Sequence, residues 1–181
     1  MSTQMGKGDI FIVDDNPNNL NLLAGILREQ NYNVRIANSG RRALVAVKAS
    51  IPELIMLDIN MPEMDGYEVC RQLKTDPAIA DVPVIFISAL DDVVDKVRAF
   101  QVGGVDYVTK PFQTGEVIAR VESQLKIFRL QKELEKSKLE LERQNEELRR
   151  TNEALVQAQK RTDLVFSALS DILPGMIIDK K

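Results

Sequence analysis

The chain has 181 residues, of which 44% are hydrophobic, and a formal net charge of −3. This length fits one domain of ordinary size plus an extension, and the charge balance offers no strongly basic surface for nucleic acid. Histidine is absent, which excludes histidine-based acid–base catalysis, histidine metal sites and a phosphohistidine within this sequence.

The N-terminus and the apolar runs carry no targeting signal. Residues 1–9 lack the apolar stretch of a signal peptide, and no run of 18 apolar residues occurs, so we expect no membrane span. The single cysteine, Cys70, cannot form an internal disulfide, which suits a reducing compartment. The sequence therefore predicts a cytoplasmic protein without membrane or direct nucleic-acid contacts.

Five short apolar runs recur through the first part of the chain. They are Ile10–Val13, Val34–Ala37, Leu54–Leu57, Val84–Ile87 and Val105–Val108. Runs that are apolar almost throughout are typical of parallel strands covered on both faces. Because helical patterns fill the gaps, we predict an α/β fold: a doubly wound five-stranded parallel sheet, flavodoxin-like, with strand order 2-1-3-4-5.

Helix boundaries are marked by capping residues. Asn16 and Pro17 are typical of an N-cap followed by proline at the first helical position. Asp65-Gly66 opens another helix, which should stop near Asp76. Val93, Val97 and Phe100 are expected to form the apolar stripe of a further helix. Glycines at 103 and 104 should end this helix.

From about Thr114 the pattern stays helical and becomes heptad-like. Leucines recur every seven residues, one heptad after Ile127, at Leu134, Leu141, Leu148 and Leu155. Four or more such heptads, with charged residues and glutamines between them, predict a long C-terminal helix that pairs in a coiled coil. We expect a parallel homodimer.

The register of this coiled coil is open between two assignments. With the leucines at d, the a positions hold Gln131, Lys138, Asn145, Asn152, Gln159 and Phe166. With the leucines at a, the d positions hold Ser137, Gln144, Thr151, Ala158 and Val165. The first is favoured, since leucine at d with asparagine at some a positions is common in parallel dimers. Either seam is polar and should be weak.

Three carboxylates follow two of the predicted strands. Asp14 and Asp15 come after the first apolar run, and Asp58 comes after the third. Strands 1 and 3 are neighbours in the predicted order, so these side chains should converge beyond the carboxyl ends of the strands. Mutual repulsion then calls for a cation, and oxygen ligands alone favour Mg²⁺.

Two further strand ends supply complementary groups. Ser88 closes "VPVIFIS" and Lys110 closes "VDYVTK", and both fall at the rim that carries the acids. A carboxylate nucleophile, a metal ion, a hydroxyl and an ammonium together suit phosphoryl transfer onto Asp58. Lys110 and the metal ion would neutralise charge on the phosphoryl oxygens, and Ser88 would bond one of them.

Four stretches carry a resemblance to a known family: "IFIVDDN", "LIMLDINMPEMDG", "VIFISA" and "YVTKPF". By these motifs, residues 9–122 resemble the receiver domain of bacterial two-component response regulators. The resemblance implies that Asp58 accepts a phosphoryl group from a histidine kinase or phosphotransfer protein. It also implies Mg²⁺ held by Asp15, Asp58 and the backbone carbonyl of Asn60, with Asp14 acting mainly through water. Tyr107 matches the family's switch aromatic, which acts together with Ser88.

The expected organisation has three parts: a receiver domain over 1–122, a coiled-coil helix continuous with helix 5 over 123–165, and a linker tail over 166–181 toward a further output domain. The leading hypothesis is a phosphorylation-dependent switch and not a turnover enzyme. The alternatives are an inert dimerisation module, or the regulatory N-terminal part of a Ser/Thr kinase or nucleotide cyclase.

Two local features are also predicted. The Lys110–Pro111 peptide should be cis, because the chain must turn there while Lys110 stays over Asp58. Leu90, two residues past Ser88, should screen the phosphoryl group from water and so slow dephosphorylation.

Overall fold

A computed structural model describes residues 6–89 and 93–172, with side chains described for all of these except 93–96 and 170–172. The chain divides into two compact units, one reaching Gln131 and the other starting at Lys132.

The first unit contains a parallel sheet in the predicted order, β2-β1-β3-β4-β5. Its strands are β1 (Asp9–Val13), β2 (Asn33–Ala37), β3 (Leu54–Asp58), β4 (Val84–Ala89) and β5 (Asp106–Lys110). The helices are α1 (Pro17–Glu29), α2 (Gly40–Ala49), α3 (Gly66–Thr75), α4 (Val93–Gln101) and α5 (Thr114–Ile172). The predicted fold class and the long C-terminal helix are therefore confirmed.

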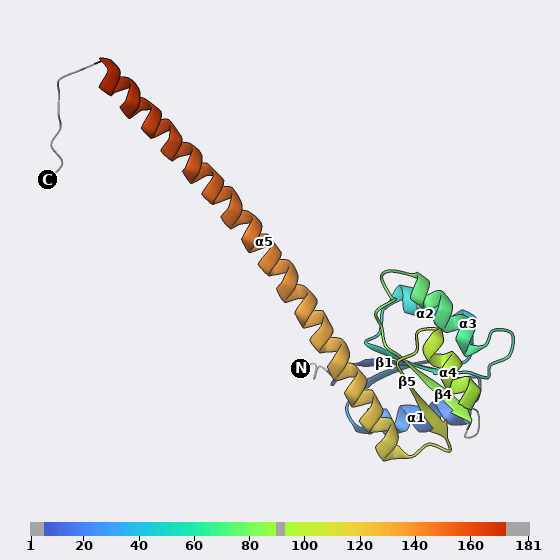
Figure 1. Cartoon of the computed structure of the whole chain (residues 1–181). Coiled ribbons are helices and arrows are strands. Elements are labelled where there is room, and N and C mark those ends of the chain that lie inside the picture. The colour runs from blue at the N-terminus through green and yellow to red at the C-terminus, as the bar shows by residue number, and fades with distance from the viewer. Residues whose placement is uncertain (1–5, 90–92, 173–181) are drawn as a thin grey trace. The chain divides into compact units, whose positions relative to one another are not determined.

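The strands are apolar because both faces of the sheet are covered (Figure 1). On one face, Phe11 of β1 and Phe86 of β4 pack in a cluster with residues of α2, α3 and α4. On the other face, Ile12 and Ile85 pack with α1 and the first turns of α5. Successive residues of a strand point to opposite faces, so each apolar run feeds two cores.

The capping predictions hold. The Asn16 side chain accepts a hydrogen bond from the Asn18 N–H, with Pro17 at the first position of α1. The Asp65 carboxylate accepts a bond of 2.7 Å from the Glu68 N–H, and α3 ends at Thr75. These bonds satisfy amide groups that have no partner inside the helix.

The predicted apolar stripe of α4 is wrong in part. Val97 and Phe100 are 54% and 51% exposed, whereas Ala99 is 2% exposed (the side chain of Val93 falls outside the described residues). The reason is close packing: a Cβ on Gly104 would lie 2.5 Å from the Phe86 ring and 2.9 Å from the Ala99 carbonyl. Among the described side chains of α4, Ala99 therefore packs against the sheet, whereas Val97 and Phe100 remain more than half exposed.

Apolar packing and an ion pair both hold the last turns of α5 in the first unit. Val121 and Leu125 are 0% and 2% exposed. One turn later the Arg129 guanidinium donates from Nε and Nη2 to the two Glu53 carboxylate oxygens, at 2.9 Å each, and to the Lys7 carbonyl. We call this contact the Arg129–Glu53 clamp. A Cβ on Gly8 would lie 2.7 Å from both partners, so the clamp needs glycine there.

The second unit is the remainder of α5. From Lys132 to Leu169 every side chain is exposed except Glu146, which is intermediate. It contains ion pairs between residues three or four apart, such as Arg149 with Glu146 at 3.0 Å. None of the described helices is long and apolar enough to cross a bilayer.

Candidate functional site

The carboxyl ends of β1 and β3 bring three acids together. Val13 pairs with Leu57, so the residues that follow them, Asp14 and Asp58, lie side by side. Carboxylate oxygens of Asp14, Asp15 and Asp58 lie within 4.8 Å of one another. Asp14 is 0% exposed and Asp58 is 3% exposed, whereas Asp15 faces solvent. The structure thus assembles the acid cluster that the strand order implies.

The loop after β3 folds back tightly onto Asp58. The Gly66 N–H donates to the Ile59 carbonyl at 2.9 Å. A Cβ on Gly66 would lie 2.2 Å from the Asp58 carbonyl oxygen, which no side chain could tolerate. Glycine at the start of α3 therefore lets the helix approach the acid and fixes the position of its backbone.

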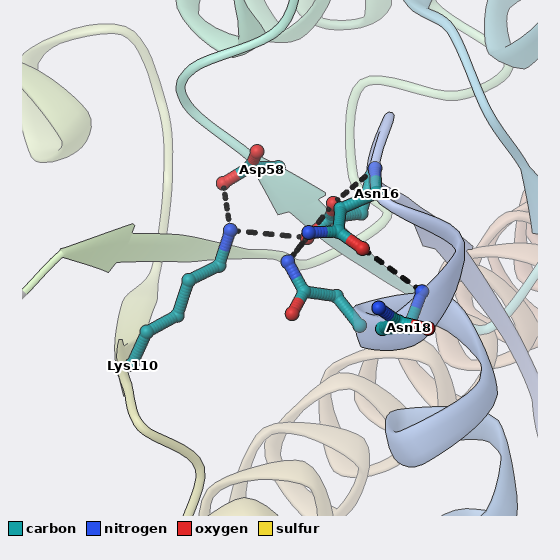
Figure 2. Close-up of polar contacts among 6 residues, drawn as sticks. Asn16, Asn18, Asp58 and Lys110 are labelled. Atoms are coloured by element: carbon teal, nitrogen blue, oxygen red, sulfur yellow. Dashed lines mark hydrogen bonds and ion pairs between the residues drawn. The ribbon is translucent and has the colours of Figure 1, made fainter.

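Lys110 supplies the positive charge of the site. Its Nζ lies 2.9 Å from Asp58 Oδ1 and 3.1 Å from Asp14 Oδ2. Figure 2 shows the Lys110 side chain extended toward the Asp58 carboxylate, with Asn16 and Asn18 on the other side of the site. Burial alone lowers the pKa of Lys110, but the hydrogen bond and charge of Asp58 outweigh it and raise that pKa. Lys110 is therefore a fixed cation here.

The electrostatic balance at Asp58 is different. Burial raises its pKa to about 6; the Lys110 hydrogen bond opposes this, and the charges of Asp14 and Asp15 reinforce it. At pH 7 the ionised form still prevails by about ten to one. Asp58 is thus a largely ionised, poorly hydrated carboxylate, which is the form that acts as a nucleophile.

Asn19 was not identified from the sequence. Its Nδ2 donates to both oxygens of Asp14, at 3.1 and 2.9 Å, and the Asn16 N–H donates to Asp14 Oδ1 at 2.8 Å. These bonds explain how a fully buried carboxylate is tolerated. The signal was the spacing in "DDNPNN", where Asn19 is the third residue of α1.

Ser88 lies at the end of β4, one residue beyond Ile87, which pairs with Asp58. It is 4% exposed, and its Oγ has no hydrogen-bond partner among the described residues. A buried hydroxyl without a partner costs roughly 1–3 kcal/mol, so its presence beside the acids is consistent with a ligand that bonds to it.

Tyr107 and its neighbours lie at the outer strand. The Tyr107 ring is half-buried, 6.4 Å from the Phe100 ring and 5.2 Å from the Arg120 guanidinium.

Three further predictions concern the loops around the site. Asn60, whose backbone carbonyl is a predicted metal ligand, is exposed. The Lys110–Pro111 peptide is cis, as predicted. Leu90 lies outside the described residues, so its proposed screening role remains a prediction.

The donor set fits a hard divalent cation. Three carboxylates meet here, and Lys110 contributes a single positive charge against them. Oxygen ligands of this kind suit Mg²⁺, which would offset the remaining repulsion.

Comparison with known proteins places this geometry in a family. The family model for the response regulator receiver domain matches residues 10–122. The DNA-binding dual master transcriptional regulator RpaA of Synechocystis sp. is 38% identical over 117 residues, which are 65% of this chain and 48% of RpaA. The response regulator PleD of Caulobacter vibrioides is 40% identical over 114 residues, 63% of this chain and 25% of PleD. The chain therefore spans half or less of these relatives.

Comparison with solved structures also finds response regulators. A putative response regulator from Chloroflexus aurantiacus is 32% identical with a TM-score of 0.64, covering 65% of this chain and 97% of that one. NtrX from Brucella abortus, in complex with ATP, is 30% identical with a TM-score of 0.66, covering 70% of this chain and 29% of that one. In each case the similarity spans about two thirds of this chain.

Proposed function

The chain belongs to the response regulator receiver domain family, and from that premise we propose that it is a phosphorylation-dependent switch whose phosphoryl acceptor is Asp58. A histidine kinase or phosphotransfer protein would be the donor in a cytoplasmic two-component pathway. The chain takes part in its own phosphorylation but is not a turnover enzyme.

The observation that carries this proposal is the contact between the buried Asp58 carboxylate and the partly buried Lys110 ammonium. An Asp58 oxygen attacks phosphorus, forming an O–P bond, while the P–N bond of a phosphohistidine donor breaks and its electron pair stays on the imidazole. Lys110 Nζ, 2.9 Å from Asp58 Oδ1, is placed to neutralise charge on the phosphoryl oxygens. Ser88 Oγ, which is buried, would donate a hydrogen bond to one of those oxygens.

Mg²⁺ is part of the proposal. Asp14, Asp15, Asp58 and the backbone carbonyl of Asn60 would hold it, with Asp14 acting mainly through water. The ion would supply positive charge next to the transferred phosphoryl group. Removing a carboxylate ligand, as in Asp15→Asn, should therefore weaken Mg²⁺ binding while leaving the fold intact.

The acceptor is tested by phosphate uptake from labelled acetyl phosphate in the presence of Mg²⁺. Asp58→Asn should abolish the incorporation of acid-labile phosphate. Asp65→Asn is the matched control: it changes an aspartate of the same loop, but asparagine caps a helix as well as aspartate does, so incorporation should persist. Undiminished uptake in Asp58→Asn would refute the assignment.

The output is proposed to pass through a parallel homodimer of α5 to a C-terminal effector. Bonding of Ser88 to the phosphoryl group would let Tyr107 turn inward, reshaping the face formed by α4, β5 and the start of α5. A polar, marginal seam can be shifted by such a change, because a few kcal/mol suffice to move a two-state equilibrium. Although RpaA is named a DNA-binding regulator, we assign no nucleic-acid contact to this chain.

The dimer is tested by sedimentation of the full chain with and without beryllofluoride, a phosphoryl mimic. Leu148→Glu should make the chain monomeric, since Leu148 belongs to the heptad column. Leu139→Glu is the control, because Leu139 is as exposed (69% against 59%) but lies outside that column. If the native chain is monomeric both with and without beryllofluoride, the proposed dimer is refuted, and the acceptor proposal is unaffected. Failure to bind beryllofluoride would favour the inert module instead.

A further inference from the structure

The exposed part of α5 offers two faces for pairing, and both use the same leucines. Leu134, Leu141, Leu148 and Leu155 are all more than half exposed. The second core column of a two-stranded coiled coil lies either three or four residues after each leucine. Ser137 and Lys138 are the first residues that distinguish the two choices.

The column three residues after the leucines is the less polar. Continued one heptad back, it consists of Leu130, Ser137, Gln144, Thr151, Ala158 and Val165. The other consists of Gln131, Lys138, Asn145, Asn152, Gln159 and Phe166. The first contains three apolar residues and no charge, and its Leu130 and Val165 are 55% and 59% exposed. Because seam residues leave water on pairing, this column is the less costly to bury.

Lys138 decides between the columns by charge. In a parallel, in-register pair, the second column sets Lys138 against the Lys138 of the other copy, and like charges in a seam repel. With the first column, Lys138 lies at an e position opposite Glu133 of the other copy at g, an attractive arrangement. Within its own helix Lys138 reaches Glu142 only at 4.0 Å, and its side chain is 76% exposed.

The flanking residues repeat this arrangement. In the first register Glu140 and Glu147 lie at g, opposite Asn145 and Asn152 of the other copy at e, so carboxylates face amide donors. A shallow groove on the helix surface is lined by Glu133, Lys136, Ser137, Glu140, Leu141 and Gln144. Five of these six belong to this seam or its g flank.

We propose that two copies of this chain pair in parallel and in register along α5, with the leucines at a and the Ser137 column at d. This proposal rests on the dimer proposed above, and it reverses the register that leucine and asparagine preferences alone favour. The partner of this face is a second copy, held by apolar contacts and by the Glu133–Lys138 pair across the seam.

Cysteine cross-linking of the full chain separates the registers. Ser137→Cys and Lys138→Cys are adjacent substitutions on a common background, since the native Cys70 is fully buried. Core positions face their counterparts within the Cα separation that a disulfide needs, about 4.4–6.8 Å, whereas e and g positions lie farther apart. Under mild oxidation Ser137→Cys should cross-link at least about tenfold faster than Lys138→Cys. Thr151→Cys should likewise outpace Asn152→Cys.

The outcomes are distinguishable. Faster cross-linking of Lys138→Cys and Asn152→Cys would overturn the proposed register and leave the dimer standing. Equal rates at each pair would also overturn it, since no register would then be fixed. No cross-linking together with monomeric sedimentation would overturn both the register and the dimer.

A second comparison avoids cysteine altogether. Ser137→Leu would place an apolar residue in the proposed core and should tighten the dimer by about tenfold or more in dissociation constant. Lys138→Leu would lie at the edge and should not tighten it. Tightening by Lys138→Leu but not by Ser137→Leu would contradict the proposal.

Discussion

The two units of this chain use charge in different ways. The first unit contains ion pairs between residues far apart in sequence: Lys110 pairs with Asp58, 52 residues away, and Arg129 with Glu53, 76 residues away. In the second unit, the ion pairs among the described residues join positions three or four apart on one helix. Long-range pairs depend on tertiary structure, whereas short-range pairs support a helix that has no tertiary structure of its own.

The apolar residues differ in the same way. The leucines of β3 are fully buried, whereas those of the heptad column are more than half exposed. A helix whose leucines face solvent has a face suited to a partner. Sequence hydrophobicity alone therefore does not determine whether a leucine contributes to folding or to association.

The sharpest test of this contrast is the same substitution in both units. Leu57→Ala removes a side chain that is 0% exposed and should lower the free energy of unfolding by about 2–5 kcal/mol. Leu148→Ala removes one that is 59% exposed and should change the unfolding of the first unit by less than about 0.5 kcal/mol. Urea denaturation at low micromolar concentration measures both. If both variants lost a comparable free energy of unfolding, the leucines of the two units would not differ in their contribution to folding.

Asp58 should reduce the stability of the metal-free protein near neutral pH. Burial raises its pKa from 3.8 to about 6, so folding disfavours the charged form. A carboxyl with a raised folded pKa costs stability as pH rises from about 4 to 6, and the full cost remains above that range. The cost is at most about 3 kcal/mol, from about two pKa units at 1.36 kcal/mol each.

Asp58→Asn should therefore stabilise the chain in EDTA at pH 7.5, and this gain should disappear near pH 4. Denaturation of both proteins across this pH range measures it. A gain that is equal at both pH values would show that ionisation of Asp58 is not its cause.

Disrupting the Arg129–Glu53 clamp should have the smallest effect on the free energy of unfolding, because both side chains are partly exposed, at 48% and 35%. Burial raises the pKa of Glu53, but the bonds from Arg129 and the Asp9 N–H outweigh it and lower that pKa. The clamp therefore stabilises above the ordinary glutamate pKa, and its contribution is lost as pH falls through the lowered value.

Glu53→Gln should cost about 0.5–1 kcal/mol at pH 7, less in high salt. Gly8→Ala should have a similar effect without removing a charge, because its Cβ would lie 2.7 Å from both partners. Amide exchange in the last turns before Gln131 reports the loss. Unchanged exchange in both variants would mean that the clamp does not hold α5.

The sheet and the acid cluster could be predicted because the relevant signals are local. Apolar runs mark strands, and Asp14 and Asp58 directly follow two of them, so strand order alone brings these acids together. The caps at Asn16 and Asp65 are equally local, since each bonds an amide two or three residues away.

The features that escaped prediction depend on contacts that no periodicity reveals. The apolar pattern of α4 gave no sign that the helix packs through Ala99, because the close approach depends on Gly104 meeting the Phe86 ring. The clamp joins residues separated by most of the first unit. The role of Asn19 depends on its bond to Asp14, five residues earlier, and the sequence pattern does not indicate that contact.

Chemical trapping of the modified residue would show whether Asp58 carries the phosphoryl group. The full chain is treated with acetyl phosphate and Mg²⁺ and then reduced with borohydride, which converts an aspartyl phosphate to homoserine. Peptide mapping by mass spectrometry then locates the change. We expect homoserine at position 58 and at no other aspartate; homoserine at position 14 or 15, with none at 58, would refute Asp58 as the acceptor.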